Sequence, residues 1–71
     1  MSLTDRLKKN YRNGREEKRL FEKKFHYYSI MNDFPDSDIP YKKIIEINQQ
    51  LDAIPKPRGF LEETAYALGG A

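Results

Sequence analysis

The sequence predicts an all-α fold, namely a small helical hairpin joined by a proline linker to a short C-terminal helix. Apolar residues recur at spacings of three, four or seven over residues 4–31 and again over residues 39–54, which is the period of an α-helix. The turn-forming stretch 32–37 separates these two segments. We therefore divide the 71-residue chain into a hairpin at 1–54, a linker at 55–59 and a short helix and tail at 60–71.

The first helix is expected to run from about Thr4 to Met31. The dipeptide Asn13-Gly14 favours a turn, and glycine costs about 1 kcal/mol relative to alanine inside a helix. If the helix continues, Gly14 lies in its apolar stripe and lets another backbone approach. If it breaks, residues 1–12 form a separate basic helix or arm. The turn signal favours a break or kink at Gly14. The stripe comprises Leu3, Leu7, Tyr11, Gly14, Phe21, Phe25 and Tyr28, with a companion row of Leu20, Tyr27 and Met31.

The second helix is expected to start after Asp38, whose side chain can cap it. Pro40 then falls in the first turn, where its missing N–H costs nothing. Pro55 ends the helix, and residues 55–59 form a stiff connector. The apolar face of this helix carries Ile44, Ile47, Leu51 and Ile54, and it is widened by Tyr41 and Ile45.

The C-terminal helix is expected to start at Phe60, with Glu62 and Glu63 in its first turn and Gly69-Gly70 as its stop. Isolated helices shorter than about 12–15 residues are marginal in water. This segment therefore either docks on the hairpin or requires a partner.

The composition excludes several classes of site. The chain has no cysteine and one histidine, which removes disulfides, cysteine nucleophiles and nearly every zinc site. No apolar run approaches the roughly 20 residues of a membrane-spanning helix. His26 lies opposite the apolar stripe, so we expect a solvated histidine rather than a general acid or base. We expect a cytoplasmic, non-enzymatic protein with no catalytic residue, metal, cofactor, small-molecule substrate or membrane partner.

Charge is distributed unevenly along the chain. Residues 1–25 hold nine Lys and Arg against four Asp and Glu, a net charge of +5, whereas residues 26–71 hold four against seven, a net charge of −3. A basic helix face of this kind favours nucleic acid or an acidic protein surface. The alternative is a solvated face on which Glu16 and Glu17 pair with Lys18 and Arg19. The candidate contact residues are Arg12, Arg15, Arg19 and Lys23.

Aromatic residues are the densest feature of the sequence. Packing in the hairpin would place Phe21, Phe25 and Tyr28 against the second helix. A two-helix hairpin covers only one side of each ring, so part of this surface needs the C-terminal helix, a second copy of the chain or another protein. We therefore expect a protein–protein interaction module: an adaptor, an inhibitor, a phage accessory protein or a subunit of a larger assembly. Its partner-binding residues are predicted to be Phe21, Phe25, Tyr28, Phe60, Leu61, Tyr66 and Leu68.

A five-residue stretch of the second helix suggests a third function. Asn48-Gln49-Gln50-Leu51-Asp52 resembles the Ser-Gln-Glu-Leu-Asp signature of the small aspartyl-phosphate phosphatases of sporulation. The resemblance implies a helical hairpin that docks on a response regulator and helps water attack its phosphoaspartate. Gln49, Leu51 and Asp52 agree with the signature, whereas Asn48 and Gln50 depart from it. The proline-linked tail has no counterpart in that family.

Overall fold

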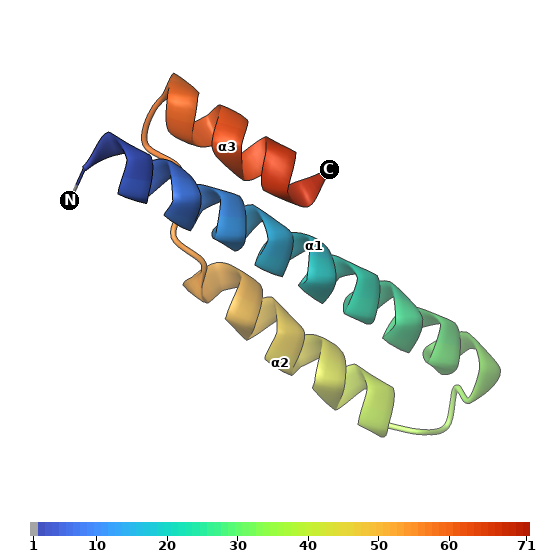
Figure 1. Ribbon diagram of the computed structural model, residues 1–71. Coiled ribbons are helices and arrows are strands. Elements are labelled where there is room, and N and C mark those ends of the chain that lie inside the picture. Colours follow the sequence, from blue (N-terminus) through green and yellow to red (C-terminus); the bar gives the residue numbers. More distant parts are fainter. Residues whose placement is uncertain (1) are drawn as a thin grey trace.

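The computed structural model describes residues 2–71 and confirms the all-α fold. These residues form α1 (Leu3–Asp33), α2 (Ile39–Ala53) and α3 (Phe60–Gly70). The central helix α1 has α2 packed along one side and α3 along another (Figure 1). α2 runs antiparallel to α1, whereas α3 runs parallel to it along its N-terminal half. Within the described residues the α2 and α3 backbones do not approach each other, so the molecule is long and thin, with extents of 49 × 20 × 14 Å.

α1 is one unbroken helix through Asn13 and Gly14, so the predicted break or kink at Gly14 is wrong. The helix also starts at Leu3 rather than Thr4, because Ser2 is its N-cap and the Ser2 hydroxyl accepts a hydrogen bond from the Asp5 N–H at 3.2 Å. Its C-terminal end lies at Asp33, just before the Phe34-Pro35 loop.

The contact between α1 and α2 uses the companion row of α1 rather than its main aromatic stripe. Leu20 is only 1% exposed and forms the core with Ile47 and Ile54, against which Tyr27 and Leu51 pack. The expected packing of Phe21, Phe25 and Tyr28 on α2 is therefore wrong. A helix can turn only one stripe toward each neighbour, and Leu20 and Tyr27, seven residues apart, form the stripe that faces α2.

The start of α2 differs from the sequence prediction in one contact. Pro40 does lie in the first turn and is buried. The Asp38 side chain, however, makes no capping hydrogen bond and instead lies 3.3 Å from Lys42 Nζ. The Ile39 N–H donates to Ser37 Oγ at 3.4 Å, so Ser37 takes a weak form of the expected capping role.

The contact between α1 and α3 brings two backbones together at glycines. A Cβ atom added to Gly14 would lie 2.9 Å from the carbonyl carbon of Tyr66, and one added to Gly69 would lie 2.9 Å from the carbonyl carbon of Tyr11. Real Cβ contacts are not this short, so neither position tolerates a side chain without movement. Gly69 and Gly70 belong to α3 and do not stop it, which corrects the predicted end at Leu68.

Polar contacts also hold α3 on α1. Glu62 is 9% exposed; its carboxylate accepts a hydrogen bond from the Arg58 N–H at 3.0 Å and lies 3.6 Å from Arg6 Nε. The Tyr66 hydroxyl donates to the Glu17 carboxylate. The C-terminal helix therefore docks on the hairpin, which was one of the two outcomes open from the sequence. Among residues 2–71, no helix combines the length and the apolar character that crossing a membrane requires.

Candidate interaction surfaces

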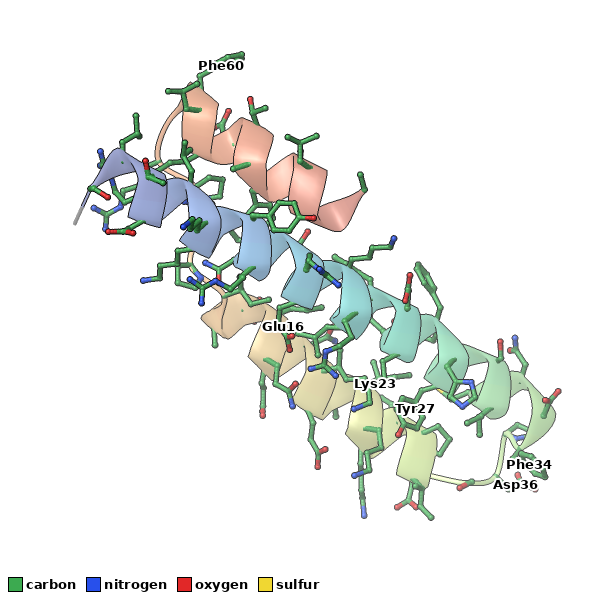
Figure 2. The ribbon with its side chains drawn as sticks, viewed as in Figure 1. Glu16, Lys23, Tyr27, Phe34, Asp36 and Phe60 are labelled. Carbon is green, nitrogen blue, oxygen red and sulfur yellow. The ribbon has the colours of Figure 1, made fainter. Side chains whose placement is uncertain are left out.

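α3 turns its small and polar side toward α1 and its large apolar side chains outward. Glu62 and Gly69 are buried against α1, whereas Phe60 is 80% exposed and Leu68 is 62% exposed. Figure 2 shows Phe60 projecting from α3 away from α1. The glycine contact explains this orientation, because only the side of α3 that carries Gly69 can approach the α1 backbone. We call Phe60, Leu61 and Leu68 the outer face of α3.

A second exposed apolar surface continues along α1 where α3 ends. Phe21, Phe25 and Tyr28 follow Gly14 at spacings of seven, four and three, so they lie on the face of α1 that α3 covers further upstream. A groove at this point is lined by apolar and charged residues, namely Gly14, Glu17, Lys18, Phe21, Glu22 and Phe25 of α1, and Tyr66, Ala67 and Gly70 of α3. We call Phe21, Phe25 and Tyr28 the aromatic strip.

Lys24 crosses the aromatic strip. Its ammonium nitrogen lies 5.9 Å from the centroid of the Phe21 ring and 5.9 Å from that of the Tyr28 ring, within the range of a cation–π contact. Both rings remain about 40% exposed, so the lysine covers them only in part.

The structure separates Tyr66 from the other predicted partner-binding residues. Phe21, Phe25, Tyr28, Phe60, Leu61 and Leu68 are exposed, whereas Tyr66 is half-buried between α3 and α1. Burial and the hydrogen bond to Glu17 raise the pKa of Tyr66 to about 12. Lys56 Nζ lies 3.8 Å from the same Glu17 carboxylate, so this group links α1, the linker and α3. Tyr66 therefore positions α3 and does not lie on the outer face.

Three of the predicted basic residues are exposed on a face of α1 that is bordered by the C-terminal end of α3. Arg12, Arg15 and Arg19 line an open hollow of about 880 Å³. Arg19 pairs with Glu16, as the sequence predicted, and this hydrogen bond lowers the pKa of Glu16. Lys23 is exposed further along α1, outside the hollow. We call this hollow the basic trough; it is lined by Tyr11, Arg12, Arg15, Glu16, Lys18, Arg19 and Glu22 of α1, and by Leu68, Gly69 and Ala71.

The residues that suggested catalysis do not form a site together with other reactive groups. Gln49 and Asp52 are exposed on α2, and His26 is exposed on α1 with its ring 5.8 Å from that of Tyr27. Among residues 2–71, no group of three or more His, Asp and Glu side chains is arranged to hold a metal ion.

Sequence reasoning missed the inward role of Glu62 and Gly69. Their spacing carried a usable signal, because Glu62, Tyr66 and Gly69 follow each other at four and three residues and so share one side of a helix. Phe60, Leu61 and Leu68 lie off that side. No family model, curated protein or solved structure matches this chain. Contacts, burial and charge are therefore what supports a function.

Proposed function

We propose that this protein is a small, non-enzymatic protein–protein interaction module, acting in the cytoplasm as an adaptor, an inhibitor or a subunit of a larger assembly. The observation that supports the proposal is the outward orientation of α3. Phe60, Leu61 and Leu68 are all more than half exposed, although α3 is already docked on α1. Small monomeric proteins rarely leave neighbouring large apolar residues in water, and where they do, the patch usually binds another surface.

The energetic gain available from covering this surface is large for so small a protein. Burying one Leu or Phe side chain fully is worth about 1.5–3 kcal/mol. The outer face offers three such residues, and the aromatic strip adds more along the adjoining part of α1. Clusters of aromatic and aliphatic anchors of this kind supply most of the binding energy of protein interfaces. The partner is another protein or a second copy of the chain.

The proposal is tested by removing two anchors from the outer face of α3. Both Phe60 and Leu68 are exposed, so the double variant Phe60→Ala with Leu68→Ala should keep the helical circular dichroism of the wild type. The wild-type chain should either gain mass with concentration in light scattering or retain a specific protein on a column that carries it. The double variant should lose that association.

A matched control removes two exposed apolar residues from the opposite end of the molecule. Phe34→Ala with Tyr41→Ala deletes aromatic rings that are 62% and 57% exposed, near the hairpin loop. This control should associate as the wild type does. A wild-type chain that stays monomeric and retains nothing contradicts the proposal. So does a Phe60→Ala, Leu68→Ala variant that loses helicity while its association is unchanged.

The two other functions suggested by the sequence have narrower support. Nucleic-acid binding is supported by the arginines of the basic trough, although Glu16 and Glu22 line the same hollow. Phosphatase-like activity is supported by the exposure of Gln49 and Asp52 on α2 of an antiparallel hairpin.

A further inference from the structure

The basic trough combines an excess of positive charge with apolar side chains, since four Lys and Arg residues but only two Glu residues line it. Arg19 is paired with Glu16, but Arg12 and Arg15 have no carboxylate within 4.0 Å among residues 2–71. Lys18 Nζ donates a hydrogen bond to the Ala71 backbone oxygen at 3.2 Å. An unpaired cation in a hollow attracts a carboxylate or a phosphate from outside the chain.

The apolar component of the trough favours a protein over a nucleic acid as the occupant. Leu68 and Tyr11 both line the trough, and these residues are 62% and 42% exposed. A partner that carries both apolar side chains and carboxylates can satisfy the leucine, the tyrosine and the arginines together.

The spacing of the arginines matches that of carboxylates on an α-helix. Arg12, Arg15 and Arg19 follow each other at three and four residues on a straight helix, which places the first and last about 10 Å apart along the axis. A second helix lying alongside α1 presents side chains at the same period. Acidic residues at positions i, i+3 or i+4, and i+7 would therefore meet the three arginines in turn, with an adjacent apolar row against Leu68 and Tyr11.

We propose that the basic trough binds an acidic amphipathic helix of another protein. The three arginines pair with its carboxylates, while Leu68 and Tyr11 contact its apolar row. This inference deepens the proposed function and depends on it, because it names the chemistry of the partner.

The experiment measures the binding of a labelled peptide by fluorescence anisotropy. The probe is an amphipathic peptide of about 20 residues, long enough to form a helix, with leucines in one row and glutamates beside them. A second peptide carries glutamine in place of each glutamate. The chain should bind the acidic peptide more tightly than the glutamine peptide, and added salt should weaken the acidic complex because it screens exposed charges.

Variants of the trough locate the binding site. Arg12→Gln with Arg15→Gln should weaken binding of the acidic peptide about threefold to tenfold, the effect expected from two exposed charge pairs. The matched control is Lys42→Gln with Lys43→Gln, which removes the same charge from α2, away from the trough. That control should change the affinity less than about twofold. Arg15→Lys, which keeps the charge, should retain most of the affinity.

Four results would overturn the inference. In the first, the arginine variant binds the acidic peptide as tightly as the wild type does. In the second, the acidic and glutamine peptides bind equally or not at all. In the third, a labelled oligonucleotide binds the wild type more tightly than the acidic peptide does, and the arginine variant no longer binds the oligonucleotide. The fourth is a wild-type dimer in light scattering that the arginine variant dissociates, since a second copy would then fill the trough. The variant Phe60→Ala, Leu61→Ala changes the outer face without touching a trough residue, and it separates the two proposals. If only that variant loses the partner, the trough inference fails and the interaction module stands.

Discussion

At the residue scale, single polar side chains fix the position of α3. The Glu17 carboxylate accepts a hydrogen bond from the Tyr66 hydroxyl and lies near the Lys56 ammonium group. The Glu62 carboxylate accepts a hydrogen bond from the Arg58 N–H and lies near the Arg6 guanidinium group. Each carboxylate thus joins segments that are far apart in sequence. Because Glu62 is buried, removing its partners would leave a charge without compensation, which costs more than the contact itself contributes.

Tyr66 should make the docking of α3 sensitive to alkaline pH. The folded protein raises its pKa from 10 to about 12, so the fold favours the protonated phenol. The resulting stabilisation is complete below about pH 10 and is lost as the pH rises from about 10 to about 12. Phenolate absorbance should therefore show a titration phase near pH 12 from Tyr66, with a loss of helical circular dichroism as the pH rises from about 10 to about 12.

The control for this prediction is Tyr66→Phe. The variant should lack the phase near pH 12 in its phenolate titration. A wild-type titration with no phase near pH 12, or the same phase in Tyr66→Phe, would contradict the prediction.

At the element scale, α1 and α3 pack through glycine rather than through interlocking side chains. Gly14 lies against the backbone of Tyr66, and Gly69 lies against the backbone of Tyr11. Of the large side chains of α3, Tyr66 is partly buried and packs against the core, whereas Phe60, Leu61 and Leu68 remain exposed. The same contact therefore docks α3 and exposes its outer face.

Gly14→Ala should weaken the docking of α3 even though alanine is the better helix former. Alanine favours the helix by about 1 kcal/mol over glycine, but overpacking against a neighbour costs about 1–3 kcal/mol. The obstructing atoms belong to the Tyr66 backbone, which cannot rotate away, so α3 must shift. Amide hydrogen exchange in α3 should accelerate while exchange in the middle of α2 stays nearly unchanged.

Gly59→Ala is the matched control. A Cβ atom at Gly59 would meet nothing within 4 Å, and its backbone is extended, with φ −160°. This variant should exchange as the wild type does. Equal effects of the two substitutions would show that glycine at position 14 is not needed for the close approach.

At the scale of the whole molecule, the core is small because three helices lie in a thin arrangement with α1 in the middle. Among residues 2–71, Leu20 is the one large side chain that is less than 2% exposed. A chain of this length typically has a free energy of unfolding of about 4–10 kcal/mol. The stability of the fold therefore depends heavily on this side chain.

Leu20→Ala should lower the free energy of unfolding by about 2–5 kcal/mol, since it removes a buried side chain and leaves a cavity. Urea denaturation followed by circular dichroism measures the change. Phe25→Ala removes a larger side chain that is 65% exposed, and it should change stability by no more than about 0.5 kcal/mol. If the two variants were equally destabilised, the aromatic strip would be part of the core.

Sequence periodicity predicted the three helices, their order and the hairpin, because apolar spacing and proline positions are local properties. The predicted break at Gly14 was wrong. The turn preference of Asn13-Gly14 depends only on neighbouring residues, whereas the close contact between Gly14 and α3 depends on the tertiary fold. The sequence prediction also failed at Asp38, since the sequence shows that a cap is possible and not which side chain makes the bond. Among the predicted partner-binding residues, the half-burial of Tyr66 could not be read from the sequence, because its bond to Glu17 joins residues that only the fold brings together.

The sequence by itself determined an all-α chain with a basic first helix, a proline linker and more aromatic residues than a hairpin can bury. The tertiary structure decided which stripe of α1 each neighbour covers. Leu20 and Tyr27 face α2, Gly14 faces α3, and the aromatic strip is left uncovered beyond α3. A helix presents several stripes of similar spacing, and only the positions of the neighbouring helices select among them. The approach of two backbones at Gly14 and Gly69 makes that selection for α3, and it turns the apolar residues of α3 toward solvent.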